Sequence, residues 1–553
     1  MQHFENRSKK HRSRSLLKAG ALALTLVITL AFSGCGDTES GKTAEDTPPQ
    51  KTEVDTQAPR RLFYASTKDI RDINPHLYRG EMAAQNMVFD PLVINTLDGL
   101  KPGLAESWEI SEDGRIYTFH LRKNVTFTDG APFNALAVKL NIDAVTSNKP
   151  RHAWLELVNQ IDKTEAVAEL IFRLTLKNAY YPTLVELALT RPFRFISPNC
   201  FIDGETKNGV NAYVGTGPWV LSEHKLNQYA IFTANPGYWG PRPRIDSIKW
   251  KAMPDHQTIL LALQKGEIDM LFGADGDMID IDAFKALETQ GKYQTLLSHP
   301  IASRAILLNA HQPITKEITV RRALQYVVDK EAIAQGILNG SETVAQTLLS
   351  SSVPYCNVTL KPYAYDPEKG KELLDQAGWK MGEDGYRYRD GTPCELTIYF
   401  NSNNSQERTI SEFVQSNLKA VGVKLNIMGE EKQAFLDRQR SGKFDLQYSL
   451  SWGIPYDPQS YVSSWRIPAH GDYQAQKGLE KKQWLDQTVS DLLIEADREK
   501  REKMYKEVLT YIHDSCVYIP LSFSRTKAVA VRRLKGVTFS PSQYEIPFEK
   551  MYF

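Results

Sequence analysis

The sequence lacks the short motifs that mark common enzyme classes. It contains no GxSxG, HExxH, Walker A or GxGxxG motif, and its 11 histidines are scattered along the chain. The five cysteines include no CxxC pair, so their spacing predicts neither a thiolate metal cluster nor a particular disulfide pairing. No set of residues is therefore predicted to be catalytic, and we expect the cysteines after Cys35 to be buried or incidental.

The chain also lacks an excess of charge of either sign. It has 67 Lys and Arg against 66 Asp and Glu, a net charge of +1, so no global field attracts nucleic acid. A hydrophobic fraction of 42% and a charged fraction of 24% are typical of a folded globular protein. At about 150 residues per domain, the 553 residues predict roughly three or four domains.

Long hydrophobic runs are scarce as well. The uncharged stretch over residues 19–32 is shorter than the roughly 20 residues that a helix needs to cross a bilayer, and a basic segment precedes it. This combination predicts a secretion signal over residues 1–34. The string Phe32-Ser33-Gly34-Cys35 resembles a bacterial lipobox, which predicts lipidation of Cys35; the alternative is a chance cysteine after an ordinary signal.

Residues 35–59 are rich in Thr, Glu, Asp, Lys and Pro, which predicts a disordered linker. Acyl chains on Cys35 would then hold the mature protein at the extracytoplasmic face of the cell membrane.

From residue 60 onward, strand-like and helix-like patterns alternate without an internal repeat, which predicts an α/β or α+β fold. A hairpin is predicted over residues 108–121, because apolar residues alternate after an Asp113-Gly114 turn. A helix is predicted to begin after the capping residue Asp366 and to end at Gly378. A further helix is predicted over residues 321–329, with its arginines in solvent.

Arginines and aromatic residues occur together in segments 150–155 and 191–195, and a turn-rich aromatic loop covers residues 452–458. Arg151 and Trp154 are three residues apart, so a helical segment would place them on one face. Rings provide dry pocket walls, and the guanidinium fork binds carboxylates in a bidentate way. The alternative is a set of core aromatics and surface arginines.

These segments resemble the peptide and nickel (family 5) solute-binding proteins of ABC importers. Strings of the family in general are LAESW (104–108), VTFTDGAPF (125–133), GTGPW (215–219), YWG (238–240) and GEID (266–269). Strings that resemble the nickel-binding members are NPHLY (74–78), RHAWLEL (151–157), AYYP (179–182), RPFRF (191–195) and WGIPYDP (452–458). The resemblance extends from about residue 60 to the end of the chain.

The resemblance implies an α/β, two-lobed periplasmic-binding-protein-like fold (type II, cluster C), with an extra subdomain inserted in lobe 1. The implied domains are lobe 1 over residues 60–302, its subdomain over about 98–212, lobe 2 over 303–524, and a return to lobe 1 over 525–553. A hinge would close the lobes on the ligand. The implied partners are an ABC permease and its ATPase subunits, and the protein itself is expected to be a monomer.

The resemblance also places a ligand site in the cleft between the lobes. It assigns metal contact to His470, carboxylate binding to Arg151 and Arg191, aromatic walls to Trp154, Trp452 and Tyr456, and the pocket edge to Met82. An ordinary loop histidine and a core methionine are the alternatives for His470 and Met82.

Two departures from the nickel-binding members concern this site. The loop over residues 79–82 is one residue shorter, which puts the reach of Met82 in question. Leu436 stands at the place of a pocket tyrosine, which removes a hydroxyl group and leaves the identity of the chelator open.

The chemistry of nickel(II) indicates what form of the metal would bind. The ion prefers about six N or O donors, and one imidazole cannot supply them. Arginines repel a bare cation, so two of them beside His470 indicate an anionic chelate, for example with histidine, a tricarboxylate or an opine-like compound. No catalytic cofactor is expected.

The predicted function is therefore a lipid-anchored receptor that delivers chelated nickel, or a related metal such as cobalt, to an ABC permease. One alternative is a binding protein for a peptide or for an opine-type metallophore that carries cobalt or zinc. An extracellular hydrolase is the other alternative, and the missing catalytic motifs disfavour it.

Overall fold

The computed structural model describes residues 60–152, 154–273, 278–451 and 458–553. The predicted signal peptide, Cys35 and the predicted linker lie outside these ranges. Within them, no helix combines the length and the apolar character needed to cross a bilayer.

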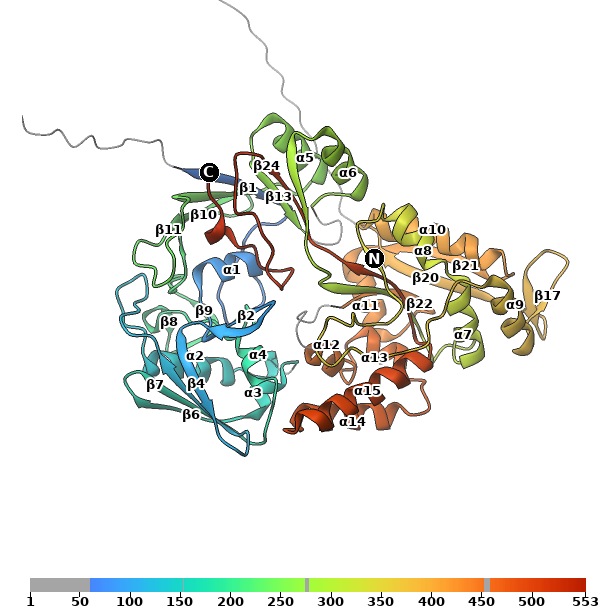
Figure 1. The fold of residues 1–553 in the computed structure, drawn as a ribbon, viewed down its shortest axis with the longest axis horizontal. Helices are drawn as coiled ribbons and strands as arrows, with labels where there is room; N and C mark the ends of the chain where they lie inside the picture. The colour runs from blue at the N-terminus through green and yellow to red at the C-terminus, as the bar shows by residue number, and fades with distance from the viewer. Residues whose placement is uncertain (1–59, 153, 274–277, 452–457) are drawn as a thin grey trace, which may run out of the picture. The chain divides into compact units, whose positions relative to one another are not determined.

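A seven-stranded sheet contains strands from both ends of the described chain (Figure 1). Strand β1 pairs in parallel with β12 and β13, whereas β24 runs antiparallel to its neighbours β13 and β14. The order is β10 (Trp219–Lys225), β11 (Tyr229–Ala234), β12 (Ser247–Ala252), β1 (Arg61–Ser66), β13 (Met270–Gly273), β24 (Lys527–Val531) and β14 (Tyr293–Leu297). The helices of this region are α1 (Met82–Val88), α5 (His256–Lys265) and α6 (Ile281–Gln290).

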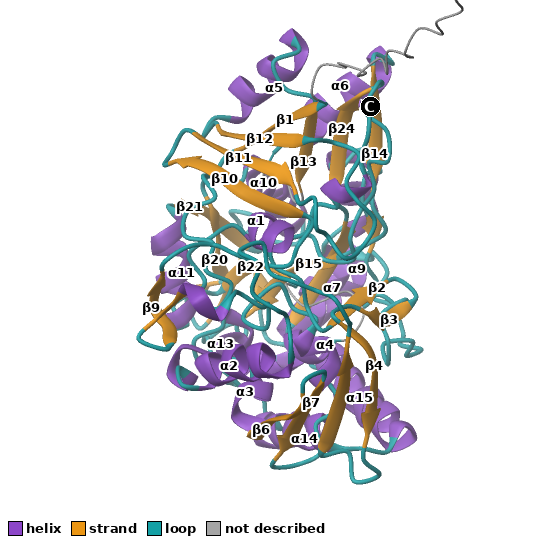
Figure 2. Ribbon diagram, turned by 90° about the vertical axis from the view of Figure 1, so that its left-hand side faces the viewer, coloured by secondary structure: helices purple, strands orange, loops and turns teal. Residues whose placement is uncertain are grey.

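A six-stranded sheet is built from the second half of the chain (Figure 2). Its order is β16 (Thr343–Val344), β23 (Tyr518–Ser524), β15 (Ala302–Leu308), β22 (Leu446–Leu450), β20 (Glu395–Asn401) and β21 (Lys424–Glu430). The helices of this region are α7 (Ile318–Val327), α8 (Lys330–Ala332), the π-helical turn η3 (Ile333–Ile337), α9 (Pro367–Gln376), α10 (Ser405–Lys419), α11 (Lys432–Ser441), α12 (Gln459–Ser464), α13 (Gly471–Gln476), α14 (Lys482–Ile494) and α15 (Arg498–Asp514).

The chain passes between these two sheets twice, once from β14 to β15 and once from β23 to β24. The two connections are hydrogen-bonded to each other: the amide of Ser298 donates to the carbonyl of Thr526 at 3.0 Å, and the Thr526 amide donates to the Ser298 hydroxyl at 2.9 Å. The α/β fold class expected from the sequence is confirmed.

A four-stranded antiparallel sheet is inserted in the chain between β1 and β10 of the seven-stranded sheet. Its order is β4 (Ala105–Ile110), β5 (Ile116–Leu121), β7 (Ile171–Leu176) and β6 (Ile161–Ala168), and it is accompanied by α2 (Ala135–Thr146), η1 (Lys149–His152), α3 (Glu156–Gln160), α4 (Thr183–Leu187) and η2 (Pro198–Cys200). The predicted hairpin is confirmed, because β4 and β5 pair around a turn in which Gly114 has φ of 68°. The alternating residues Tyr117, Phe119 and Leu121 are buried.

Smaller elements complete the fold. They are the hairpin β2 (Val93–Thr96) and β3 (Gly99–Pro102), the pair β8 (Phe201–Ile202) and β9 (Glu205–Val210), the three strands β17 (Lys380–Met381), β18 (Arg387–Arg389) and β19 (Thr392–Pro393), and the 3₁₀ turn η4 (Phe548–Lys550).

The helix predicted after Asp366 is confirmed as α9. The Asp366 carboxylate accepts a hydrogen bond from the Lys369 amide at 2.9 Å, and Gly378 has φ of 81° just beyond the helix. These are the capping contacts that satisfy free backbone groups at helix ends.

The expectation that the arginines of the helix predicted over residues 321–329 are in solvent is wrong for Arg321. This residue lies on α7 and is buried, with its guanidinium donating to the carbonyls of Ser515, Thr315 and Lys316. Charged hydrogen bonds to three carbonyls offset the cost of removing the guanidinium from water.

The four cysteines in the described ranges are buried, as the sequence led us to expect; they are Cys200, Cys356, Cys394 and Cys516.

Candidate functional site

A cavity of about 2390 Å³ is lined by residues of both large-sheet regions and of the C-terminal segment. Small-molecule sites usually measure roughly 300–1,000 Å³, so this one has room for a ligand together with ordered water. Four of the residues predicted for the site line it: Met82, Trp154, Arg191 and His470.

Tyr78 stands at the centre of the first group of site residues. The guanidinium carbon of Arg151 lies over its ring at 4.6 Å from the centroid, and that of Arg191 lies over the same ring at 5.2 Å. A ring face attracts cations through its quadrupole, so one ring holds both charges. We call Tyr78, Arg151, Trp154 and Arg191 the arginine cluster.

The hydroxyl of Tyr78 connects this residue to Trp154, the remaining member of the cluster. The indole N–H of Trp154 donates to it at 2.9 Å, and Nδ1 of His152 is hydrogen-bonded to it at 2.7 Å. Burial raises the pKa of Tyr78 to about 12, which keeps the hydroxyl protonated. Burial and the nearby charge of Arg151 lower the pKa of His152 to about 4, so this imidazole is neutral at pH 7.

The loop that carries Tyr78 is fixed by buried polar residues of the NPHLY string. The side-chain amide of Asn74 donates to the Thr206 carbonyl at 2.9 Å, and the imidazole of His76 is hydrogen-bonded to the Thr206 hydroxyl at 2.8 Å. Gln85 of α1 donates to the carbonyls of Asn74 and Leu77. Because a buried side chain without partners is costly, these bonds favour one conformation of the loop.

Arg191 and Arg151 differ in exposure. Arg191 is half-buried, its Nη1 donates to the carbonyl of Gly80 at 2.9 Å, and burial lowers its pKa. Arg151 lies within the turn η1, is exposed, and is not among the residues that line the cavity. Among the described residues, neither guanidinium forms an ion pair with a carboxylate.

His470 immediately precedes α13 and reaches the cavity from the six-stranded region. Burial lowers the pKa of its imidazole, while the neighbouring Asp472 opposes this shift. Asp472 is buried and accepts hydrogen bonds from the hydroxyls of Tyr461 at 2.7 Å and Tyr518 at 2.8 Å. A neutral imidazole is the form that ligates a metal ion.

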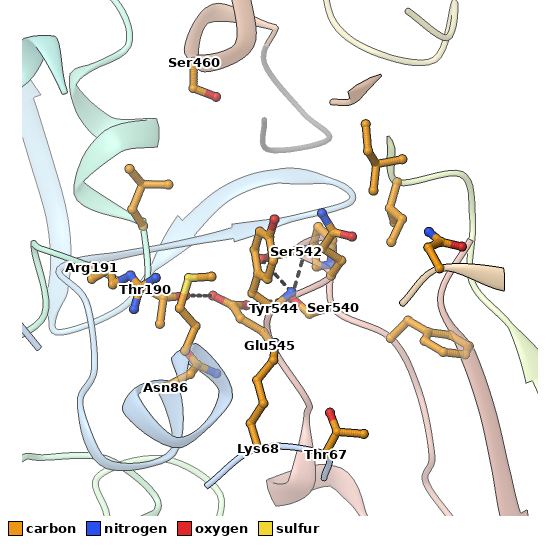
Figure 3. A pocket seen from close by; sticks show the side chains of 18 of the residues that line it. Thr67, Lys68, Asn86, Thr190, Arg191, Ser460, Ser540, Ser542, Tyr544 and Glu545 are labelled. Atoms are coloured by element: carbon orange, nitrogen blue, oxygen red, sulfur yellow. Dashed lines mark hydrogen bonds between the residues drawn. The ribbon is translucent and has the colours of Figure 1, made fainter. Parts of the chain in front are cut away.

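The C-terminal segment forms a further part of the cavity lining (Figure 3). Glu545 accepts hydrogen bonds from Thr190 at 2.9 Å and from Ser540 at 2.7 Å, and it pairs with buried Arg194 at 3.1 Å. This carboxylate therefore already has a cationic partner in Arg194, whereas no described carboxylate pairs with Arg191, next to Thr190.

A buried carboxyl group connects segments on both sides of the site. Glu186 accepts hydrogen bonds from the Leu157 amide at 3.0 Å, the Tyr180 hydroxyl at 2.5 Å and the side chain of Gln459 at 3.3 Å. Burial raises the pKa of Glu186 to about 7. Leu157 follows Trp154 in the chain, and Gln459 begins α12, which also carries the cavity residue Ser460.

The structure places Met82 on the cavity lining in spite of the shorter loop before it, at the start of α1. Leu436 of α11 also lines the cavity. The departure from tyrosine at this position therefore concerns the lining of the site. Trp452 and Tyr456 lie outside the described residues.

Sequence reasoning overlooked Tyr78, Asp472, Glu545 and Glu186. Tyr78 ends one of the strings that resemble nickel-binding members, which was the available signal for it. Nothing in the local sequence marks the two glutamates, because their partners are far away in the chain.

Comparison with known proteins identifies the family. The profile of the bacterial extracellular solute-binding proteins, family 5 Middle, matches residues 99–473. The nickel-binding periplasmic protein of Escherichia coli (strain K12) is 41% identical over 502 residues, which cover 90% of this chain and 95% of that protein.

Two solved structures extend the comparison. NikA from Brucella suis in complex with Fe(III)-EDTA has 44% identity and a TM-score of 0.87, covering 89% of this chain and 99% of that one. NikZ from Campylobacter jejuni in complex with Ni(L-His) has 25% identity and a TM-score of 0.77, covering 90% of this chain and 100% of that one.

The resemblance to nickel-binding members, the two-lobed fold class and the expectation of a binding protein rather than an enzyme are confirmed by these matches. The chain belongs to the family 5 bacterial extracellular solute-binding proteins.

Proposed function

We propose that this protein binds nickel(II) as an anionic chelate outside the cytoplasm and delivers it to an ABC permease with its ATPase subunits. The observation that carries the proposal is the pair of guanidiniums over Tyr78, which have no carboxylate partner among the described residues. A guanidinium without a carboxylate partner attracts carboxylates and repels a bare cation. His470 is the proposed metal ligand.

The relatives support a chelate of this kind. The ligands in the structures of the Brucella and Campylobacter proteins are Fe(III)-EDTA and Ni(L-His), and both chelators carry carboxylates. In the proposed complex the carboxylates face Arg151 and Arg191, Trp154 supplies a wall, Met82 the edge, and the imidazole of His470 contacts the metal. Trp452 and Tyr456 remain proposed as further aromatic walls.

Two observations favour a chelator larger than a single small acid. The cavity is large, and Phe435 and Leu436 add apolar side chains to an α11 lining that also includes Lys432, Gln439 and Arg440. Burying a polar ligand group against Leu436 without a partner costs roughly 1–3 kcal/mol. An opine-type metallophore that carries nickel, cobalt or zinc is therefore retained as the alternative ligand.

The experiment is calorimetry on protein stripped of metal and chelator. We expect nickel(II) alone to give no saturable heat and nickel(II) with L-histidine to give tight 1:1 binding, because one imidazole cannot offset dehydration of the ion. Tight binding of the metal alone would contradict the proposal and require protein ligands beyond His470.

The domain division and the anchor are part of the proposal. The passages between the large sheets, from β14 to β15 and from β23 to β24, support lobe boundaries near residues 302 and 524. The lipobox-like string supports lipidation of Cys35. Labelling of wild type, but not of Cys35→Ser, with a fatty-acid probe in the host would test the anchor.

A further inference from the structure

One aromatic ring contacts both arginines of the proposed site. We propose that Tyr78 is the positioning residue of this site, and that its ring sets two guanidiniums at the spacing that binds a chelate with at least two carboxylates. The inference rests on the proposed function and adds to it the class of chelator and the residue that selects it.

The first step concerns the repulsion between the two arginines. Neither guanidinium carbon lies farther than 5.2 Å from the centroid of the Tyr78 ring, so two like charges are held near one point. The two like charges repel each other, and Arg191 is also partly removed from water. The ring attracts each cation through its face and so opposes their separation.

The second step concerns how firmly the ring itself is held. Its hydroxyl is bonded to the Trp154 indole at 2.9 Å and to Nδ1 of His152 at 2.7 Å, and both partners come from the segment that carries Arg151. Arg191 is held separately, by the carbonyl of Gly80, which lies two residues after Tyr78. The ring is thus the common contact of two segments about 40 residues apart.

The third step concerns the ligand. Arg194, a few residues from Arg191, has a protein counter-ion in Glu545, but the two arginines over Tyr78 have none among the described residues. A ligand with one carboxylate engages one fork and leaves the other charge uncompensated. A ligand with two carboxylates neutralises both, so the gain in affinity depends on the spacing that the ring maintains.

The experiment compares the affinities for two nickel(II) probes, one that carries carboxylates and one that carries none and is therefore a dication. Nickel(II) with excess L-histidine presents a carboxylate on each ligand, and nickel(II) with excess histamine presents the same imidazole and amine donors without carboxylates. We expect wild-type protein to prefer the histidine complex strongly. Tyr78→Leu should lose at least about tenfold for the histidine complex and little for the histamine complex, because the cation–ring contacts are gone.

A conservative variant and a coupling test separate positioning from general stability. Tyr78→Phe keeps the ring and loses one hydroxyl, so it should weaken the histidine complex by roughly threefold. Adding Tyr78→Leu to the pair Arg151→Ala/Arg191→Ala should cause no further loss, since Tyr78 acts through these arginines. The control is Tyr552→Leu, which removes a ring whose centroid lies 3.4 Å from the guanidinium carbon of Arg244. Neither of these two residues lines the cavity.

Three results would overturn the inference while leaving the proposed function intact. They are a Tyr78→Leu protein that prefers the histidine complex as strongly as wild type, a loss in Tyr78→Phe equal to that in Tyr78→Leu, and a full additional loss in the triple variant. Wild-type protein that binds neither complex would overturn the proposed function and the inference together.

Discussion

The two sides of the cavity hold their ionisable groups in different ways. In the arginine cluster two cations share one neutral ring, and no described carboxylate neutralises them. Around His470 the imidazole lies near Asp472, a buried carboxyl group whose oxygen is held by two tyrosine hydroxyls.

This difference divides the recognition of a chelate into two tasks. The arginine cluster offers positive charge to whatever anionic group enters, and it would bind a metal-free chelator as well. The imidazole of His470, the proposed metal ligand, would respond to the metal. High affinity for the complex, and not for its parts, then requires both sides.

The largest loss of chelate affinity is expected when the proposed metal donor is removed. We expect His470→Ala to lose measurable binding of nickel(II)–histidine, at least about a hundredfold, because the variant removes the proposed coordination bond to the metal. The melting temperature should stay within a few degrees of wild type, since a cavity-facing imidazole contributes little packing. Calorimetry and thermal unfolding measure the two effects.

The exposed residue His311, which does not line the cavity, provides a matched control. His311→Ala should bind as wild type does. Unchanged affinity in His470→Ala would instead move the metal contact to another residue.

The next largest effect is expected in the arginine cluster. Arg191→Ala should cost roughly 2–4 kcal/mol in chelate binding, the range for a desolvated charge pair that loses one partner. Arg151→Ala should cost less, because Arg151 is exposed. Calorimetry with nickel(II)–histidine measures both losses.

Lysine at position 191 should restore only part of the affinity, because an ammonium lacks the guanidinium fork. Arg498→Ala, at an exposed surface ion pair, is the control. If Arg151→Ala lost more than Arg191→Ala, the ranking by burial would be wrong.

The smallest effect concerns the two histidines beside the site. Burial lowers both pKa values, to about 4 for His152, and the charge of Asp472 limits the shift for His470. Lowered values mean that both imidazoles are neutral at pH 7 and acquire a proton only as the pH falls below 6.5. Proton NMR titration of the ring Cε1–H signals, assigned with His470→Ala, should give His470 a midpoint below 6.5 and His152 a lower one.

A His470 midpoint at or above 6.5 would show that Asp472 dominates over burial. The site would then begin to lose its metal donor close to neutral pH, and the contrast between the two sides of the cavity would weaken.

Local patterns predicted much of the fold. The 108–121 hairpin and helix α9 depend on contacts within a few residues, such as the Asp113-Gly114 turn and the Asp366 cap, and both are present. The burial of Arg321 escaped prediction, because the Ser515 carbonyl that it bonds is almost two hundred residues away.

The same limit applies to the candidate site. The resemblance indicated Arg151, Arg191, Trp154, Met82 and His470, but not Tyr78, which connects the first three. Tyr78 and Trp154 are 76 positions apart, and only the folded chain brings the hydroxyl to the indole. Trp452 and Tyr456 remain predictions.

Separation of the two proposed lobes would have a chemical consequence at Glu186. Its carboxyl group bonds Leu157 and Tyr180 on one side and Gln459 of α12 on the other, so it is dry only while these segments stay together. Separation of α12 would hydrate the carboxyl group and lower its pKa from about 7 toward the ordinary value of a glutamate. At neutral pH, each opening of the molecule would then release part of a proton to the solvent, and each closure would take it back.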